Sequence, residues 1–191
     1  MKGIGIVSPA SNVMNLYPNR VKNGIRFLES QGFRVKFGEF SLEMNGYVSA
    51  TAEKRIKDIN TFLKDPEVDI IIASIGGYNS NQLLDQLDYQ LIRNTKKIFC
   101  GYSDITAMLL AIHYKTGIKV IHGPTFLPEL CEYPRPYDYT MEYFEKALLN
   151  EKFSYKAPRY NINEYRDWSE DEKIRVFGLI DLRQIPGIVH G

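Results

Sequence analysis

The sequence predicts an α/β protein with a doubly wound, mostly parallel sheet flanked by helices. Short runs rich in β-branched residues alternate with amphipathic helical stretches through residues 1–121, the order that parallel strands and right-handed crossover helices produce. One run, over residues 68–75, is apolar on both faces, as expected of a central parallel strand. Both observations place a single sheet in the first part of the chain.

The first elements each carry a local signal. Residues 4–7 are predicted to form a buried strand, and residues 19–31 have apolar side chains at helical spacing and end at Gly32. A second strand is predicted over 33–37. A helix over 51–63 follows, because its apolar residues lie on one stripe.

The later elements continue the alternation after the central strand. The spacing predicts a helix over 80–87, a strand over 97–101, a helix over 104–114 and a strand over 118–121. Several prolines then interrupt the chain before a last helix over 139–149. In sheets of this kind ligands bind beyond the carboxyl ends of the strands, so the turns after the strands are the first places to look for a site.

Composition changes along the chain and suggests its organisation. Residues 1–150 are predicted to form one α/β domain. Residues 151–175 are polar, aromatic and charged, as in a linker, and residues 176–191 are expected to be the truncated start of a second domain.

The charge balance excludes some classes of partner. The 191 residues include 24 Lys and Arg against 23 Asp and Glu, a formal net charge of +1, so the chain lacks the basic excess typical of binding to nucleic acid or anionic membranes. No apolar run reaches the roughly 18 residues that cross a bilayer, and the first residues do not resemble a signal peptide. Cys100 and Cys131 are too few for a disulfide framework. We therefore expect a cytoplasmic protein with no nucleic-acid or membrane partner.

Residues 101–106 give the sharpest local signal of chemistry. They join an apolar strand to an apolar helix, so Ser103 would sit on a sharp turn with its hydroxyl exposed near the positive end of the helix dipole. The next backbone N–H lies in the first turn of the helix, where unpaired donors can hold an oxyanion. Ile105 stands where the hydrolase elbow G-x-S-x-G has its second glycine. Two interpretations stay open here: a nucleophile, or a helix cap with Asp104 complementing the dipole.

Paired glycines, Gly76 and Gly77, follow the central strand. Glycines at this place allow the backbone to approach a ligand closely and leave N–H groups free to donate. The alternative is a tight turn in which Asn79 or Ser80 caps the next helix. The lysine of a phosphate-binding loop is absent from this motif.

The three histidines do not complete a catalytic group by sequence alone. His113 is predicted to lie on the helix that follows Ser103, about three turns away, and His122 ends a strand on the same edge as Ser103. A structural role is expected for both, and His190, next to the last residue, has no predicted place. No spacing of His, Cys, Asp and Glu indicates a metal site.

Four segments in order resemble the LD-carboxypeptidase family of serine peptidases, namely residues 74–81, 83–89, 97–106 and 122–124. The Gly-Gly-Tyr-Asn-Ser form at residues 76–80 is closer to the microcin C self-immunity (MccF-like) branch than to the murein tetrapeptide carboxypeptidases. The resemblance covers residues 1–126 well and the rest loosely, which corresponds to the N-terminal domain of the family. It favours the nucleophile over the cap at Ser103.

The resemblance implies a Ser-His-Glu triad that uses no metal and no cofactor. Ser103 matches the nucleophile, and the backbone amides of Asp104 and Gly77 match the donors of the oxyanion hole. The expected substrate contacts are Gly76, Tyr78 and Asn79. The Glu and His of the triad belong to a C-terminal domain that no residue here matches. Because a serine without its base is a weak nucleophile, the chain alone is expected to be nearly inactive.

The family resemblance also implies a cytoplasmic, usually dimeric enzyme that acts through an acyl-enzyme. The MccF-like branch would cleave the amide-type bond of an aminoacyl or peptidyl nucleotide and so detoxify an antibiotic. One alternative is removal of a terminal D-alanine from a murein tetrapeptide. Alternatives of another class are a non-catalytic small-ligand binding module and a truncated product retained for oligomerisation. A strained backbone with an exposed hydroxyl at Ser103 would favour the enzyme.

Overall fold

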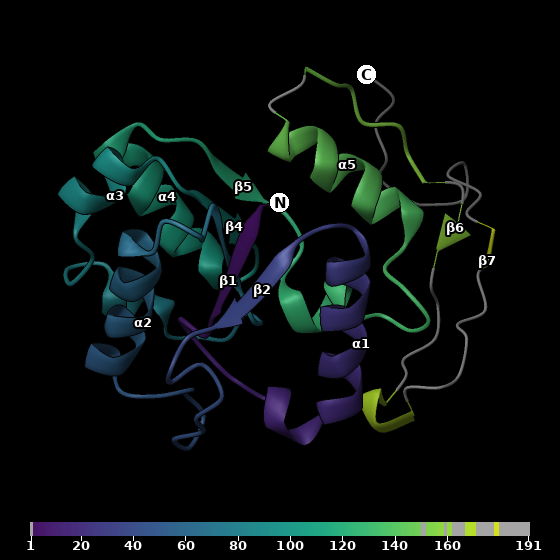
Figure 1. Cartoon of the computed structure of the whole chain (residues 1–191), viewed down its shortest axis with the longest axis horizontal. Coiled ribbons are helices and arrows are strands. Elements are labelled where there is room, and N and C mark those ends of the chain that lie inside the picture. The colour runs from purple at the N-terminus through teal and green to yellow at the C-terminus, as the bar shows by residue number, and fades with distance from the viewer. Residues whose placement is uncertain (1, 150–151, 159, 162–166, 171–177, 180–191) are drawn as a thin grey trace, which may run out of the picture.

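A computed structural model of the chain describes residues 2–149, 152–158, 160–161, 167–170 and 178–179. A five-stranded parallel sheet in the order β2-β1-β3-β4-β5 forms its centre (Figure 1). The strands are β1 (Gly3–Val7), β2 (Arg34–Phe37), β3 (Ile70–Ala73), β4 (Ile98–Gly101) and β5 (Val120–His122). The predicted fold class is therefore confirmed.

Helices cover both faces of this sheet. They are α1 (Pro18–Ser30), α2 (Ala52–Lys64), α3 (Tyr89–Thr95), α4 (Ile105–Thr116) and α5 (Asp138–Leu148), with short helical turns η1 (Met14–Leu16), η2 (Ser80–Leu83), η3 (Phe126–Leu130) and η4 (Trp168–Glu170). Figure 1 shows α2, α3 and α4 together on one side of the strands and α1 and α5 on the other.

Strand β3 shows how one short segment serves both layers. Ile71 and Ala73 belong to the apolar cluster under α2, α3 and α4, whereas Ile70 and Ile72 belong to the cluster under α1, η3 and α5. All four side chains are buried. A continuous apolar run is what a strand needs when neither of its faces meets water.

The strand order fixes where a site can form. From β1 the chain passes outward to β2, then returns across β1 to form β3 and continues to β5. The direction of winding therefore reverses between β1 and β3. In open sheets of this kind, ligands bind beyond the carboxyl ends of the strands at such a switch point. These loops follow Val7 and Ala73.

The prediction of a single helix over 80–87 was wrong. Only a 3₁₀ turn, η2, forms there, and a separate helix, α3, begins at Tyr89. Asp88 starts α3, because its carboxylate accepts a hydrogen bond from the Leu91 amide at 2.8 Å. The start of η2 is held by contacts to a distant aspartate, described below. A local apolar spacing could not reveal either constraint.

The other predicted strands and helices are present, with ends shifted by a few residues. The π-helical turn η3 was not predicted, because Pro128 within it and the prolines that follow favoured an irregular path. Pro128 is tolerated in a single turn, where few carbonyl partners are lost.

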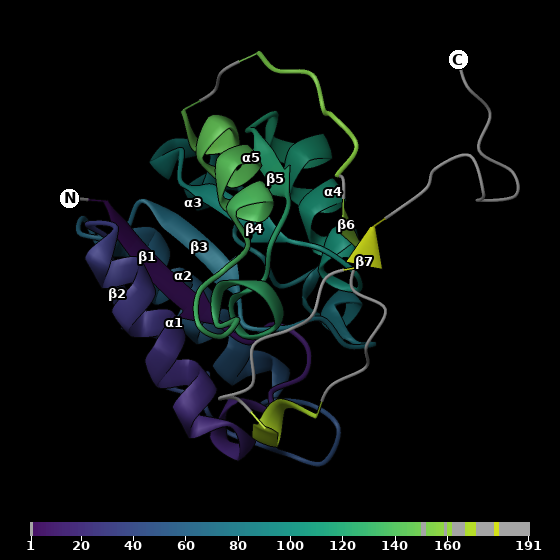
Figure 2. The same cartoon turned by 90° about the vertical axis from the view of Figure 1, so that its right-hand side faces the viewer.

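The chain turns back over α5 after residue 152, as Figure 2 shows. The Tyr155 ring lies 4.7 Å from the Tyr143 ring, and the Lys156 amide donates to the Tyr143 hydroxyl at 2.9 Å. Further along, β6 (Tyr160–Asn161) pairs with β7 (Gly178–Leu179) in antiparallel fashion. Apart from β7, the predicted start of a second domain over 176–191 lies outside the described residues, so both it and the linker stay predictions.

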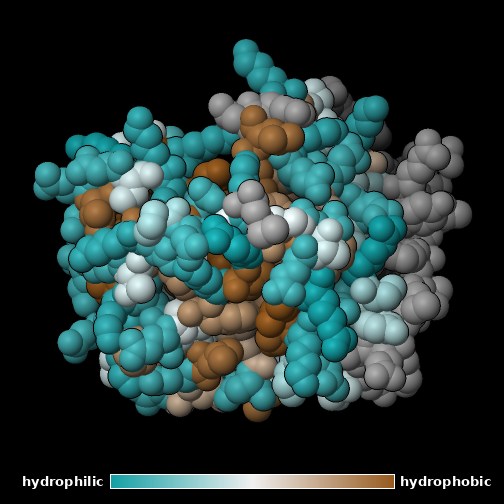
Figure 3. All heavy atoms as spheres, viewed as in Figure 1, coloured by the Kyte–Doolittle hydropathy of each residue, from teal (hydrophilic) through white to brown (hydrophobic). Residues whose placement is uncertain are grey.

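Apolar side chains reach the surface over and below β2 (Figure 3), and the loop after this edge strand carries exposed Leu42 and Met44. Within the described ranges, no helix is long and apolar enough to cross a membrane.

Asp58 on α2 makes the stability of the fold depend on pH. Its side chain is 3% exposed, and its carboxylate accepts the Phe40 amide at 3.1 Å. Burial raises the pKa of Asp58 from 3.8 to about 6, although the hydrogen bond from Phe40 opposes the shift. The native state thus holds this proton more tightly than the unfolded chain. The free energy of unfolding therefore falls as the pH rises through 6.

We expect Asp58→Asn to remove this pH dependence. Asparagine keeps an oxygen for the Phe40 amide but cannot ionise. Relative to the native chain, the variant should gain about 2 kcal/mol in the free energy of unfolding between pH 4.5 and pH 7.5. Urea denaturation of both proteins at the two pH values measures this difference, in which the carboxylates common to both cancel. An equal dependence on pH in the two proteins would contradict the assignment.

Candidate active site

Two loops meet at the switch point of the sheet. Ser11, in the loop after β1, donates its backbone N–H to the Gly76 carbonyl at 3.2 Å. Behind them, the Ser8 and Ser74 hydroxyls lie 2.7 Å apart, and Ser8 Oγ donates to the Ser41 carbonyl at 2.7 Å. The loop after β3 therefore rests on a buried set of hydrogen bonds and has little freedom to move.

Ser103 occupies a strained turn between β4 and α4. Its φ angle is +60°, a left-handed conformation that costs a non-glycine residue about 1–2 kcal/mol. The residue is exposed, and Asp104, not Ser103, holds the N-cap position of α4. The Ser103 hydroxyl has no hydrogen-bond partner in the described part of the chain. The geometry is that of an elbow presenting a hydroxyl rather than that of a helix cap.

Asp104 joins the elbow to the loop after β3. Its carboxylate oxygen Oδ2 accepts the backbone N–H groups of Asn79 at 3.0 Å and Ser80 at 2.8 Å. In return, the Ser80 hydroxyl donates to the Asp104 carbonyl at 2.8 Å. Sequence analysis had assigned Asp104 a dipole or backbone-amide role only. The carboxylate is also the distant contact that holds the start of η2.

Gly76 brings the loop against Ser103. A Cβ atom built on Gly76 would lie 3.0 Å from Ser103 Cβ, 3.1 Å from Ser103 Oγ and 3.8 Å from the Asp104 nitrogen. A Cβ on Gly77 would lie 2.6 Å from Ser11 Oγ. A side chain at residue 77 would therefore clash with the loop after β1, and one at residue 76 would crowd Ser103.

Two backbone donors remain unused in the turns after β3 and β4. Among the described residues, neither the Gly77 N–H nor the Asp104 N–H donates a hydrogen bond. The Asp104 amide also lies at the amino end of α4, where the helix dipole favours negative charge. Donors of this kind, held rigidly in advance, can stabilise an oxyanion.

The two predicted substrate contacts at the end of the loop differ in exposure. Tyr78 is 91% exposed, whereas Asn79 is only 4% exposed. Neither the nitrogen nor the oxygen of the Asn79 side-chain amide has a hydrogen-bond partner in the described part of the chain. The Tyr78 side chain therefore lies in solvent, and Asn79 has an unused amide beneath the loop.

Arg55 supports this loop from below and was missed by sequence analysis. Its guanidinium is buried and donates to the Pro9 carbonyl at 2.7 Å and to Gln82 Oε1 at 2.7 Å. Burial lowers the pKa of Arg55, and the charge of Asp104 partly offsets this. A signal was present in the sequence. Arg55 lies three residues after Ala52 and four before Ile59, so a charged residue occupies the apolar face of α2.

The Tyr102 side chain precedes the nucleophile and contacts Glu129, which sequence analysis also missed. The Tyr102 hydroxyl donates to Glu129 Oε1 at 2.8 Å. Burial raises the pKa of Glu129, and its hydrogen bonds from Tyr102 and Thr125 oppose the shift. Burial and the nearby Glu129 charge raise the pKa of Tyr102.

No described histidine is bonded to Ser103. His122 is exposed, and its ring lies 6.3 Å from the Tyr102 ring. His113 bonds through Nδ1 to the Ile118 carbonyl at 2.8 Å, far along α4. The roles expected for His113 and His122 therefore stay predictions, and His190 lies outside the described residues. Among those residues, no group of three His, Cys, Asp or Glu side chains is placed to hold a metal ion.

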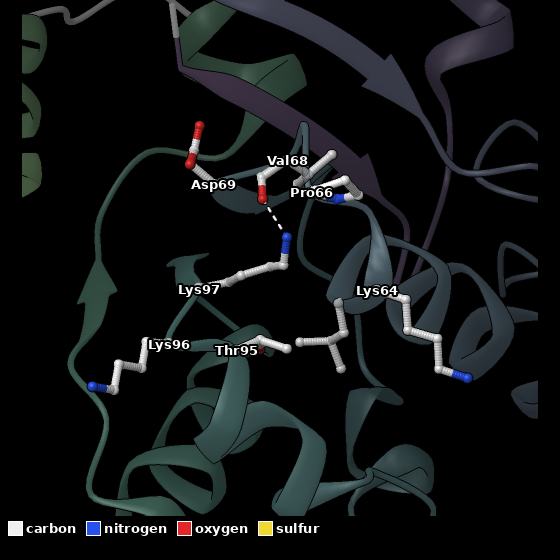
Figure 4. A pocket seen from close by; sticks show the side chains of 8 residues that line it. Lys64, Pro66, Val68, Asp69, Thr95, Lys96 and Lys97 are labelled. Carbon is white, nitrogen blue, oxygen red and sulfur yellow. Dashed lines mark hydrogen bonds between the residues drawn. The ribbon is translucent and has the colours of Figure 1, made fainter.

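A hollow of about 360 Å³ lies at the amino-terminal edge of the sheet, opposite Ser103. In Figure 4, Lys97 points at the Val68 carbonyl, while Lys64 and Lys96 point away from it. Lys97 also donates to the Asp65 carbonyl. The lysine ammonium groups do not converge on one point, so this hollow is not built to bind an anion.

Comparisons with known proteins identify relatives of the chain. Residues 4–123 match the family described as the LD-carboxypeptidase N-terminal domain. A putative carboxypeptidase of Vibrio cholerae is 36% identical over 167 residues, which cover 86% of this chain and 50% of that protein. The microcin C7 self-immunity protein MccF of Escherichia coli is 34% identical over 175 residues, 90% of this chain and 51% of that protein.

Solved structures show the same likeness. The structure of MccF in complex with glutamyl sulfamoyl guanosine matches with a TM-score of 0.85 and 34% identity, over 94% of this chain and 54% of that chain. The chain thus spans about half the length of the curated relatives it matches.

Proposed function

Because the chain belongs to the LD-carboxypeptidase family, we propose that it is the nucleophile-bearing domain of a serine-type amide hydrolase. The observation that carries the proposal is the elbow at Ser103, whose exposed hydroxyl stands on a left-handed backbone in contact with Gly76. A residue kept in a strained conformation beside two unused amide donors fits a catalytic role better than a structural one.

In the proposed reaction, Ser103 Oγ attacks the substrate carbonyl carbon and gives its proton to a base. The oxygen of the tetrahedral intermediate accepts hydrogen bonds from the Gly77 and Asp104 amides. The amide-type bond then breaks, the leaving nitrogen takes the proton, and an acyl-enzyme remains on Ser103. Water releases the acid in a second step of the same kind.

The base must come from residues other than those described. Neither His122 nor His113 is hydrogen-bonded to Ser103, and we propose that a Glu-His pair in the rest of the whole protein fills this role. Residues 151–175 would link the two domains. We also propose that the whole protein is a cytoplasmic homodimer, as the family resemblance implies.

For the substrate we propose an aminoacyl or peptidyl nucleotide, the class that an antibiotic-resistance enzyme of the MccF type would cleave. Supporting it are the likeness to MccF and the matching structure of MccF in complex with glutamyl sulfamoyl guanosine. Gly76, exposed Tyr78 and the unpartnered amide of Asn79 would provide contacts to it. A murein tetrapeptide is the competing substrate, with the same acyl transfer and a different leaving group.

The test joins the chain to the part of Escherichia coli MccF that the match leaves uncovered. The chain alone and the fusion are assayed with an aminoacyl-sulfamoyl adenosine and with a murein tetrapeptide. We expect the fusion to cleave the nucleotide at least about 10³-fold faster than the chain alone, because a triad without its base retains little activity.

Each of the other outcomes would contradict a different part of the proposal. Rapid Ser103-dependent hydrolysis by the chain alone would mean that the base lies within it. Cleavage of the murein peptide only would select the competing substrate. A folded fusion that binds the nucleotide without cleaving it would favour a binding module over an enzyme.

A further inference from the structure

The partly buried carboxylate of Glu129 has no part in the reaction proposed above. It lies on η3, and three donors surround it: the Tyr102 hydroxyl at 2.8 Å, the Thr125 amide at 2.8 Å and the Thr125 hydroxyl at 2.9 Å. A buried carboxylate costs free energy unless such donors compensate it. Three short hydrogen bonds to one charged group therefore define a rigid contact rather than a chance one.

This contact ends at the residue next to the nucleophile. Tyr102 and Glu129 are 27 positions apart in the chain and belong to the turn after β4 and to η3. The two segments are joined a second time, because Cys100 Sγ donates to the Pro124 carbonyl at 3.3 Å. The backbone just before Ser103 is therefore anchored to the segment after β5.

The backbone just after Ser103 is anchored in the opposite direction. Asp104 binds the amides of Asn79 and Ser80, in the loop after β3. Within the described residues, the Ser103 side chain makes no hydrogen bond that would keep its φ angle at +60°, and the backbone is held by the Thr106 amide on the Ser103 carbonyl at 3.0 Å. A strained residue persists only when its surroundings determine its conformation, and the two flanking anchors add side-chain constraints to that backbone bond.

We propose that Glu129 is a positioning residue for the nucleophile, which holds the Ser103 elbow through the Tyr102 hydroxyl. The kinetic part of this inference rests on the proposed function, whereas its structural part does not. Asp104 fixes the elbow on the side of the oxyanion loop, and Glu129 fixes it on the side of β5. With either anchor lost, Ser103 would sample relaxed conformations with a negative φ angle, and its hydroxyl would leave the position that it holds against Gly76.

The structural test compares two variants that each lose one tyrosine hydroxyl. Tyr102→Phe removes the hydroxyl that meets Glu129, and Tyr89→Phe removes one that donates to the Leu84 carbonyl at 2.6 Å, away from the elbow. The ¹³Cα and ¹³Cβ chemical shifts of Ser103 in the chain report whether its φ angle is positive. We expect the Ser103 and Asp104 signals to move or broaden in Tyr102→Phe and in Glu129→Gln, and to stay unchanged in Tyr89→Phe.

The kinetic test uses the same variants in the fusion with the MccF segment. We expect kcat to fall about tenfold in Tyr102→Phe and Glu129→Gln with KM within about twofold, since loss of a hydrogen bond to a charged group would disturb the nucleophile and not substrate binding. Unchanged Ser103 signals, or changes equal to those in Tyr89→Phe, would overturn the proposal. If the native fusion is inactive, the proposed function fails, and the chemical shifts still decide the role of Glu129.

Discussion

Replacing Ser103 by alanine is expected to abolish hydrolysis by the fusion enzyme, with a fall in kcat of about 10³-fold or more. No other described hydroxyl combines exposure, a left-handed φ angle and contact with the glycine loop. Because Gly77 and Asp104 keep their amides, KM should change little. Steady-state assays with the aminoacyl nucleotide measure kcat and KM of the native fusion and of the variant. Mass spectrometry of the native fusion, stopped during turnover, then looks for an acyl group on Ser103. Retained activity, or an acyl group elsewhere, would refute the assignment of the nucleophile.

The same site predicts that function and stability oppose each other. Ser103→Gly removes the side chain and the strain together, so the chain should gain about 1 kcal/mol in the free energy of unfolding relative to Ser103→Ala. Lys96 is a matched control, because its φ angle is +54° at the end of α3, away from the site. Lys96→Gly should have a free energy of unfolding higher than that of Lys96→Ala by a similar amount, and it should leave hydrolysis unchanged. Equal stabilities of the Gly and Ala variants at 103 would mean that the elbow is not strained.

Local pattern was enough to predict the sheet. The apolar run around Ile70 to Ala73 could only be a strand covered on both faces, and the turn residues after it and after β4 marked the carboxyl edge. The local pattern also marked Ser103, Gly76 and Gly77 as turn residues, but it left a nucleophile and a helix cap both open at Ser103, and only the family resemblance favoured the nucleophile.

The residues that hold the site together were not predictable in this way. Arg55 meets Pro9 across 46 positions of the chain, and Glu129 meets Tyr102 across 27. Periodicity describes which face a residue occupies, not which distant group it meets. At the break between η2 and α3, the Asp88 carboxylate caps the new helix by accepting the Leu91 amide, a polar contact that apolar spacing does not describe.

Breaking the ion pair between Arg20 and Glu132 is expected to destabilise the chain more than any surface charge would. Arg20 Nη2 lies 3.1 Å from Glu132 Oε2, with the two side chains 3% and 6% exposed. The same guanidinium donates to the Leu127 carbonyl at 2.9 Å and the Pro128 carbonyl at 2.8 Å. Arg20→Met would leave a carboxylate and two carbonyls buried with a lost partner, at a cost of about 3–5 kcal/mol in the free energy of unfolding.

Two comparisons test whether the loss of stability comes from the burial of this ion pair or would follow the loss of any ion pair. Arg34 and Glu67 lie closer, at 2.7 Å, but are 45% and 50% exposed, so Arg34→Met should cost no more than about 1 kcal/mol. The double variant Arg20→Met, Glu132→Leu should be more stable than Arg20→Met alone, since it removes the buried carboxylate that has lost its Arg20 partner. Urea denaturation measures all of these values. Similar losses for Arg20→Met and Arg34→Met would show that burial does not govern the pair.

Loss of the Arg20 contacts should also affect the Ser103 elbow, because Arg20 binds the segment that carries Glu129. The Arg20 side chain on α1 bonds to Leu127, Pro128 and Glu132, and its charge favours the ionised form of Glu129, against the effect of burial on the pKa of that group. In Arg20→Met we therefore expect the Ser103 signals to move under conditions where the chain is still folded. If they stayed fixed while stability fell, α1 would support the fold alone, and the position of the nucleophile would depend only on Tyr102 and Asp104.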